Sequence, residues 1–296
     1  MMRRRDLHRL ALSTVAALPW LAPAHAASVN DPQAHNARWQ KIEADSAGRL
    51  GVAVLDTATG RLDGYRLDER FPMCSTFKWL AAAHVLHRVD QGQEQLSRRI
   101  RYGRDVLLPH SPLTEPHAGR GGMTLAELCH ATITVSDNAA ANLILDTLGG
   151  PAGLTAYARG LGDSVTRLDR REPALNESTP GDPRDTTSPR AMAQSLQRTV
   201  LGDALSPVSR AQLAQWLQAT STNRQRLGAD LPEGWRLGSK TGTGAHGSTN
   251  DVGLYWPPGR APIVVAVYLT ESSAALPVRE KAMAQVARGV TTHGAG

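Results

Sequence analysis

A serine and a lysine three residues apart stand at the start of an apolar helix and could form a nucleophile with its own base. Lys78 is the only formally charged residue in the run 77–86, and Ser75 lies just before that run. Helical i,i+3 spacing places the hydroxyl beside the amine. A helix apolar on nearly every face belongs in a core, where burial lowers the pKa of a lysine. The pair therefore predicts an activated serine at a helix N-terminus, whose dipole favours negative charge.

A single Ser-x-x-Lys match is common by chance, so the interpretation needs support from other parts of the chain. Two further motifs carry groups that acyl transfer needs. Ser136 offers a second hydroxyl for proton relay, although alone it also fits a helix N-cap, and Asn138 offers an amide. Glu172 and Asn176 are four residues apart in the charged run 163–187, which has no apolar period. One helical turn there would let both side chains hold a water, with the carboxylate as its general base. Long irregular loops of this kind are usually functional.

The fourth motif is Lys240-Thr241-Gly242-Thr243, on a predicted strand. The lysine brings positive charge and the threonines bring hydroxyls, which together suit a carboxylate. Glycine in a strand leaves room for a ligand to lie against the backbone. The motif therefore predicts the wall of a binding cleft.

The elements that must position these motifs follow from caps and periodicity. Helices are expected at 32–47, from residue 77, from Thr124, at 139–148 and 151–161, after Ser188 and Ser206, and at 277–290; strands are expected at 50–56, 61–67, 235–242, 252–256 and 263–270. The order predicts an α/β (α+β) sandwich: a five-stranded antiparallel sheet built from both chain ends and flanked by helices. Residues 27–66 and 219–296 would form this domain, and 67–218 an inserted, mostly helical domain that includes the loop 163–187. The active site is expected in the cleft between the two.

The N-terminus has the pattern of a signal peptide. Three arginines at 3–5 precede an apolar run at 10–21 and an Ala-x-Ala site that ends at Ala26. About a dozen apolar residues are too few to span a bilayer, so residues 1–26 are expected to be cleaved and the protein to be periplasmic or secreted. The paired arginines leave export by the twin-arginine route open.

The charge balance argues against a nucleic-acid partner. Residues 1–26 contain four arginines and one aspartate, a net +3 out of the formal +6, so about +3 remains on the rest of the chain. No stripe of basic residues with interleaved aromatics occurs in the sequence.

Cysteines and histidines give no metal or disulfide pattern. Cys74 adjoins Ser75 in what should be packed core, and Cys129 lies in a different predicted helix. Export would permit a disulfide, but two buried free thiols are favoured. His84 and His87 lie on the apolar helix and are expected to be packed there. No His-x-His or His-Glu-x-x-His spacing occurs, so neither a metal nor another cofactor is expected.

The four motifs, in this order, resemble those of the class A serine β-lactamases over essentially the whole chain after residue 26. The resemblance implies hydrolysis of the β-lactam amide bond of penicillins and cephalosporins, and hence antibiotic resistance. The implied route is an acyl-Ser75 intermediate that water activated by Glu172 releases. The implied partner is the small β-lactam alone, with no nucleic acid, no membrane after signal cleavage, and a monomeric enzyme.

The resemblance also implies a role for each site residue. The catalytic residues would be Ser75, Lys78, Ser136, Glu172 and Asn176; the substrate-binding residues Asn138, Lys240, Thr241, Gly242, Thr243 and His110; the oxyanion donors the N–H groups of Ser75 and Thr243; and the pair that pins the loop Arg170 and Asp185. The Glu172–Pro173 bond is a candidate for the cis isomer, as in several relatives.

Several departures from the family pattern bear on specificity. His110 stands where relatives often carry an aromatic residue at the cleft rim. Penicillinase-like relatives have an arginine near Thr249, which is missing here; Arg279 is an open candidate for that cation. Gly244 replaces the cysteine that pairs with Cys74 in carbapenem-hydrolysing relatives, so that disulfide cannot form. The ranking of penicillins, cephalosporins and carbapenems as substrates stays open, as does inhibitor susceptibility.

Two other functions share part of the motif set. A peptidoglycan D,D-peptidase has the Ser-x-x-Lys and Lys-Thr-Gly elements, and a β-lactam sensor acylates and stays acylated. Both lack the deacylating glutamate, and the sensor usually has a membrane helix. Glu172 and Asn176 therefore favour the hydrolase.

Overall fold

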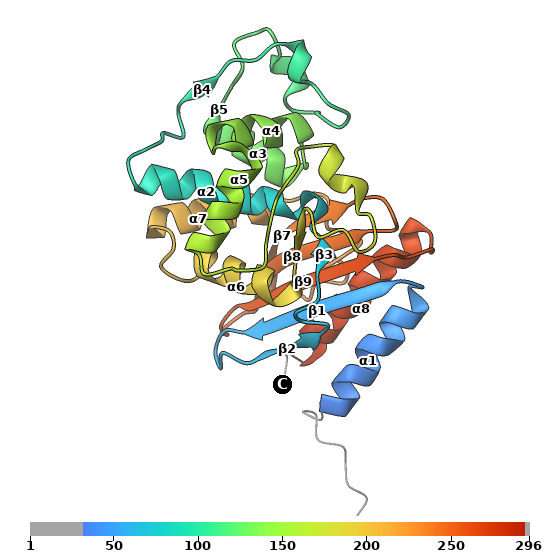
Figure 1. Cartoon of the computed structure of the whole chain (residues 1–296). Helices are drawn as coiled ribbons and strands as arrows, with labels where there is room; N and C mark the ends of the chain where they lie inside the picture. Colours follow the sequence, from blue (N-terminus) through green and yellow to red (C-terminus); the bar gives the residue numbers. More distant parts are fainter. Residues whose placement is uncertain (1–31, 294–296) are drawn as a thin grey trace, which may run out of the picture.

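A five-stranded antiparallel sheet, in the order β2-β1-β9-β8-β7, lies between two layers of helices (Figure 1). The computed structural model describes residues 32–293. The strands are β1 Arg49–Asp56, β2 Leu62–Tyr65, β7 Arg236–Thr243, β8 Thr249–Trp256 and β9 Ile263–Thr270. β1 pairs with β9 from Arg49↔Thr270 to Asp56↔Ile263, so segments from both ends of the chain meet inside one sheet, as predicted.

Within residues 32–293, two helices cover one face of the sheet and six lie on the other side. The first layer is α1 Pro32–Asp45 and α8 Leu276–His293. The second comprises α2 Phe77–Asp90, α3 Leu125–Thr134, α4 Asn138–Thr147, α5 Gly150–Gly160, α6 Pro189–Val200 and α7 Pro207–Gln218. Of these, α6 packs on β1 and β9, and α7 packs on β7.

The central strand β9 separates two hydrophobic cores. All of its residues are buried, and successive side chains point to opposite faces. Val264, Ala266 and Tyr268 join the core under the second helical layer. Val265 and Val267 join the core under α1 and α8. This burial on both faces explains why the sequence of β9 reads as a continuous apolar run rather than an alternating one.

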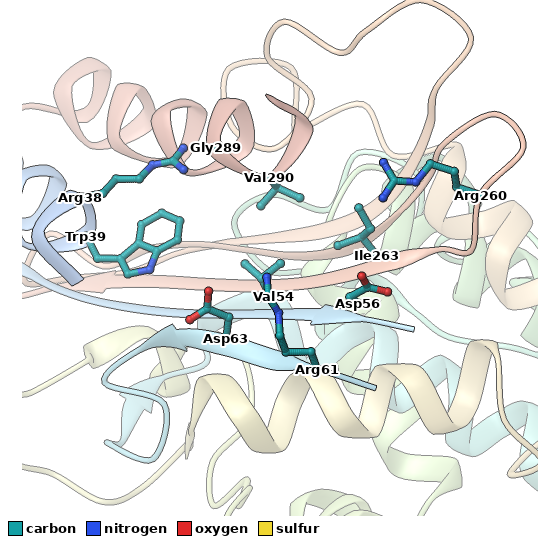
Figure 2. A pocket seen from close by; sticks show the side chains of 10 residues that line it. All are labelled: Arg38, Trp39, Val54, Asp56, Arg61, Asp63, Arg260, Ile263, Gly289 and Val290. Atoms are coloured by element: carbon teal, nitrogen blue, oxygen red, sulfur yellow. The ribbon is translucent and has the colours of Figure 1, made fainter. Parts of the chain in front are cut away.

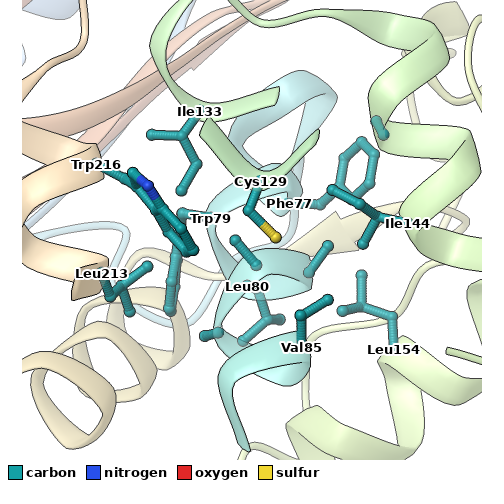
Figure 3. Close-up of a cluster of buried hydrophobic side chains, with 14 of the residues drawn as sticks. Phe77, Trp79, Leu80, Val85, Cys129, Ile133, Ile144, Leu154, Leu213 and Trp216 are labelled. Atoms are coloured by element: carbon teal, nitrogen blue, oxygen red, sulfur yellow. The ribbon is translucent and has the colours of Figure 1, made fainter. Parts of the chain in front are cut away.

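The helix α2 runs through the middle of the core that lies under the second helical layer (Figure 3). Trp79 and Leu80 are fully buried and lie among side chains from α3, α4 and α7, including Ile133, Ile144 and Leu213. Each fully buried large apolar side chain contributes about 1.5–3 kcal/mol. A helix packed on every side has little freedom to shift, so it holds the residues at its N-terminus in place.

The predicted caps are present, with one correction. Thr124 and Glu127 form a reciprocal capping box on α3, and α6 and α7 begin after capping serines. The N-cap of α4, however, is Asp137, whose side chain accepts from Ala140 N. Ser136 is therefore not the cap, and its side chain is available for another role.

The structure corrects several predicted boundaries. β8 begins at Thr249 rather than residue 252, because its first three residues are polar yet buried against neighbouring strands. Two short pairs escaped prediction: β3 Phe71–Pro72 with β6 Thr186–Thr187, and β4 Arg99–Ile100 with β5 Met123–Thr124. Two residues are too few to show a period. The stretch 103–122, for which no helix or strand was predicted, contains two 3₁₀ turns, Arg104–Val106 and Glu115–His117.

The predicted signal peptide, residues 1–26, lies outside the described residues. Within residues 32–293, no helix combines the length and the apolarity needed to cross a bilayer.

Candidate active site

Ser75 lies in a 3₁₀ turn, Cys74–Thr76, directly before α2. Strand β7 runs close against this turn at Gly242. A Cβ at that glycine would stand 2.9 Å from Met73 O and 3.2 Å from Ser75 N. Contacts that short force a neighbour to move, so glycine is what allows the strand to approach the nucleophile. The close approach brings the backbone of Ser75 beside the strand that carries Thr243.

Lys78 is fully buried, and its amine contacts polar groups of three residues. Nζ donates to Ser136 O (2.8 Å) and Asn138 Oδ1 (2.6 Å), and pairs with Glu172 Oε1 at 3.0 Å. Burial lowers the pKa of Lys78, against the opposing effect of the Glu172 carboxylate. The Ser75 hydroxyl, expected beside this amine, donates instead to Glu172 Oε1 at 3.3 Å. The nucleophile and the amine therefore share one carboxylate oxygen.

Glu172 is 4% exposed and is held at both its backbone and its side chain. Asn142 on α4 accepts from Glu172 N (3.0 Å) and donates to Glu172 O (2.9 Å). Asn176 lies in the 3₁₀ turn Ala174–Glu177, the single turn expected there, and donates to Glu172 Oε2 (2.5 Å). The Glu172–Pro173 bond is cis, as anticipated. Asn142 was missed by the sequence reasoning; its only signal is an amide within an apolar helical run.

Ser136 connects the two lysines of the cleft. Its Oγ lies 3.3 Å from Lys78 Nζ and 3.0 Å from Lys240 Nζ, and its backbone has a positive φ of 63°. An ammonium can only donate, so both lone pairs of the hydroxyl are used and its proton is free to point elsewhere. Lys240 is fully buried. Burial first, and repulsion by Lys78 second, hold the pKa of Lys240 well below its usual value.

Arg226 was not identified from the sequence, yet it lies directly behind the cleft wall. It is 5% exposed. Its guanidinium donates to Gly242 O (2.9 Å), Asn250 O (3.0 Å) and Thr243 Oγ1 (2.8 Å), and pairs with Glu280 at 3.3 Å. A single arginine in an irregular segment carries no motif, so only the fold shows where it points.

Arg279, the open candidate for the missing cation, lies on α8 and donates to Thr249 Oγ1 at 3.1 Å. Two arginines therefore stand along the strands β7 and β8. Arg226 contacts the Lys-Thr-Gly-Thr strand itself, whereas Arg279 contacts Thr249 at the start of β8.

His110 lies against the start of α4, where its backbone oxygen accepts from Asn138 N at 3.0 Å. His110 is exposed, and its ring Nε2 lies 2.7 Å from Val135 O. The Asn138 side chain donates to Pro109 O (2.8 Å) while its own oxygen accepts from Lys78. On the β7 side, Thr241 Oγ1 lies 2.6 Å from Thr222 Oγ1.

Arg170 and Asp185 close the loop 163–187 at its base. Arg170 Nε donates to Asp185 Oδ2 at 2.6 Å. The other carboxylate oxygen accepts the N–H groups of Asp169 (2.8 Å) and Arg170 (2.9 Å). The backbone oxygen of Asp185 accepts from Met73 N (2.9 Å), which connects the loop to the nucleophile turn.

Both cysteines are free and buried, in agreement with the favoured prediction. Cys74 Sγ lies 3.4 Å from Ser178 Oγ, and burial raises the pKa of the Cys74 thiol to about 12. A Cβ at Gly244 would lie 2.7 Å from that sulfur. The geometry thus places Gly244 beside Cys74, where this chain has no thiol to pair with it.

A separate cavity of about 90 Å³ lies between α1, α8 and the β1–β2 edge (Figure 2). Trp39, Val54, Ile263 and Val290 form its apolar part, and arginine and aspartate side chains surround them. None of the residues of the four motifs lines it, so this cavity is not the catalytic cleft. Among residues 32–293, no cluster of three or more His, Cys, Asp or Glu side chains is arranged to hold a metal ion.

Comparisons with known proteins agree on one family. The family model described as "Beta-lactamase enzyme family" matches residues 35–293. The chain is 45% identical to β-lactamase CTX-M-8 of Citrobacter amalonaticus over 98% of this chain and 99% of that protein. It is 51% identical to the carbapenem-hydrolyzing β-lactamase KPC of Klebsiella oxytoca over 77% and 78% of the two.

Solved structures give the same result. An ancestral (GNCA) class A β-lactamase matches with a TM-score of 0.86 and 62% identity, over 87% of this chain and 98% of that one. A putative class A β-lactamase, PenP from Rhodopseudomonas palustris, matches with a TM-score of 0.86 and 57% identity, over 89% and 100%. With residues of the four motifs joined by hydrogen bonds and ion pairs, and these relatives matched over most of its length, the chain belongs to the β-lactamase enzyme family, in class A.

Proposed function

We propose that this protein hydrolyses the β-lactam amide bond of penicillins and cephalosporins through an acyl-Ser75 intermediate, and thereby gives antibiotic resistance. One observation carries the proposal: Glu172 Oε1 lies 3.3 Å from Ser75 Oγ and 3.0 Å from Lys78 Nζ. The nucleophile and the lysine amine are thus both within hydrogen-bond reach of one carboxylate oxygen, which can pass a proton between them as covalent catalysis requires.

In the acylation step, Ser75 Oγ attacks the lactam carbonyl carbon and gives its proton to the Lys78–Glu172 pair. The backbone N–H groups of Ser75 and Thr243 stabilise the oxyanion, and one such donor is worth about 3 kcal/mol. The ring C–N bond then breaks. Its nitrogen takes a proton from Ser136, whose hydroxyl accepts from both lysines and can be reprotonated through Lys78.

In the deacylation step, Glu172 takes a proton from a water molecule that Asn176 helps to orient. The hydroxide attacks the ester carbon and the bond to Ser75 Oγ breaks. The serine oxygen recovers a proton from the lysine–glutamate network. Glu172 is buried and fixed by Asn142 and Asn176, which supports its role as a positioned base.

Recognition of the substrate rests on its carboxylate. Lys240, Thr241 and Thr243 line one wall, and Arg226 adds positive charge directly behind Thr243. Gly242 lets the substrate lie against the strand. On the other wall, Asn138 binds the amide side chain of the substrate and His110 stacks on it at the rim.

Further proposals concern the whole protein. The α/β domain comprises residues 27–66 and 219–296, the helical domain comprises 67–218, and the Arg170–Asp185 pair pins the loop. The protein is exported after cleavage of residues 1–26 and acts as a monomer on small substrates, without a cofactor. Sequencing of the N-terminus of the exported protein tests the cleavage site.

The decisive experiment traps the intermediate. In Glu172→Ala, acylation of Ser75 by benzylpenicillin remains measurable while deacylation stalls, so intact-mass spectrometry detects a persistent penicilloyl adduct. In Ser75→Ala, both the adduct and turnover are lost. Glu69→Gln, which changes an exposed carboxylate that pairs with Arg49 and Arg66, serves as the control with normal turnover. Normal turnover in Glu172→Ala would overturn the proposal.

A further inference from the structure

Asp251 is a fully buried carboxylate on β8, directly opposite a member of the Lys-Thr-Gly motif. Its partner in the strand register is Thr241, and the next pair is Lys240 with Val252. No motif or proposed catalytic step uses this residue. A buried carboxylate is costly unless it is compensated by charges or hydrogen bonds, so its surroundings show what it does.

The first connection runs from Asp251 to Arg226. Asp251 Oδ2 accepts from Leu227 N at 3.1 Å, and Leu227 O accepts from the Tyr255 hydroxyl at 2.6 Å. β8 therefore holds both backbone polar groups of Leu227. Arg226 is the preceding residue, and its guanidinium reaches Thr243 Oγ1 at 2.8 Å. The placement of this cation in the cleft wall depends on the peptide that Asp251 anchors.

The second connection is electrostatic. Asp251 interacts with Arg226 and Lys240, and its charge acts in the direction that favours the protonated form of Lys240. Burial raises the pKa of Asp251 to about 6, although both cations oppose that rise. The charge of Asp251 also acts on the hydroxyl groups of Tyr255 on its own strand and Tyr268 on β9, where it raises the pKa. At and above neutral pH, Asp251 is thus a buried negative charge beside the two cations. Glu280 also pairs with Arg226 at 3.3 Å, and the charge of Glu172 likewise favours the protonated form of Lys240.

We propose that Asp251 is a positioning residue for substrate-carboxylate recognition: it anchors the peptide that carries Arg226 and supplies the buried counter-charge for Arg226 and Lys240. The proposal rests on the proposed function, because the carboxylate in question belongs to the β-lactam. Asp251 acts through the two cations and does not itself touch the substrate.

The test is Asp251→Asn, which keeps the size of the side chain and removes its charge. For benzylpenicillin at pH 8, KM rises roughly tenfold while kcat changes little, because a weakened cation wall binds the carboxylate less well. The alkaline limb of kcat/KM moves to lower pH by about one unit, as expected when a neighbouring opposite charge is lost. The difference from the wild type shrinks below pH 6, where Asp251 is itself protonated. The methyl ester of benzylpenicillin, which lacks the carboxylate, shows no such difference.

Two further variants complete the experiment. Asp230→Asn is the control: it removes one negative charge from an exposed ion pair with Arg288 and leaves the pH dependence of kcat/KM unchanged. Tyr255→Phe removes the hydroxyl that holds Leu227 O but keeps the charge of Asp251. This variant is therefore expected to raise KM without shifting the pH dependence of kcat/KM. It also serves as the test if Asp251→Asn does not fold. The inference would be overturned if kcat/KM had the same pH dependence in Asp251→Asn and in the wild type, or if KM were unchanged in Tyr255→Phe. Absence of β-lactam turnover in the wild type would instead contradict the proposed function.

Discussion

At the scale of single residues, the site is a cluster of buried charges. Lys78, Lys240 and Glu172 are almost wholly shielded from solvent. Burying one such charge alone costs far more free energy than a protein can spare, whereas paired and hydrogen-bonded charges are tolerated. Ser136 has a central place here because its hydroxyl oxygen accepts from both ammonium groups. Removal of any one member leaves its partners uncompensated.

The substrate carboxylate has two candidate arginines, and a matched pair of variants distinguishes them. Arg226 donates to Thr243 Oγ1 in the Lys-Thr-Gly-Thr strand, whereas Arg279 donates to Thr249 Oγ1 on β8. Because Thr243 lies beside the nucleophile turn, Arg226→Gln is expected to raise KM for benzylpenicillin roughly tenfold, the effect of one lost charge-assisted hydrogen bond. Arg279→Gln is expected to change it much less. Steady-state kinetics measure both, and a larger effect from Arg279→Gln would reverse the assignment.

The residues predicted from the sequence were those in motifs with fixed spacing. Ser75 and Lys78 are separated by one helical turn, and Glu172 and Asn176 also lie within one turn, so local geometry alone indicates their proximity. Arg226 and Asn142 belong to no motif. Arg226 reaches the cleft from the segment after α7, and Asn142 reaches Glu172 from the middle of α4. Contacts of this kind depend on tertiary packing, which a single sequence does not specify.

At the scale of elements, the loop 163–187 matters most, because it carries the carboxylate. It contains little regular structure, yet Asp185 fixes its base through Arg170 and two backbone N–H groups. Hydrogen bonds to a charged group are worth about 1.5–3 kcal/mol each. The position of Glu172 therefore depends on a residue at the far end of the loop.

Asp185→Asn is expected to loosen this loop. The amide cannot form the ion pair with Arg170, so amide hydrogen exchange across 163–187 should quicken by about tenfold or more while the core helices stay protected. Deacylation should slow with it. Asp146→Asn is the matched control, since Asp146 pairs with Arg171 of the same loop only at the surface. Unchanged exchange in Asp185→Asn would show that the loop is held by other contacts.

Elements with a strong period or cap were predicted well from the sequence, and polar or very short ones were not. β9 matches its predicted range, and α6 and α7 begin at the expected serine–proline pairs. β8 was predicted three residues too short because Thr249, Asn250 and Asp251 are polar, although all three are buried. These buried polar residues interrupt the apolar pattern from which a strand is predicted.

At the scale of the whole molecule, the stability of the fold should depend on acidity through His84. Its ring stacks on Tyr157 with centroids 4.5 Å apart. Burial lowers the pKa of His84 to about 4. Because this folded-state pKa is below that of the unfolded chain, about 6.5, the stabilisation is complete above that pH and is lost as the pH falls towards 4.

The expected result is a smaller acid-induced fall in Tm for His84→Phe than for the wild type between pH 7 and pH 4.5. Phenylalanine keeps an aromatic face for Tyr157 but has no group to protonate. Thermal unfolding followed by circular dichroism measures the effect. His130→Gln, at an exposed histidine of α3, should leave the fall unchanged. An identical fall in all three proteins would show that His84 does not contribute to acid sensitivity.

The pairing of β1 with β9 along all eight residues has a consequence for biosynthesis. While the ribosome is still adding the segment after Thr249, β1 has already been made but lacks its central neighbour β9, and β7, which carries Lys240, lacks its neighbouring strand β8. Translation must therefore be almost finished before the fold can close. A prematurely terminated polypeptide would contain every catalytic side chain and still have no enzyme activity.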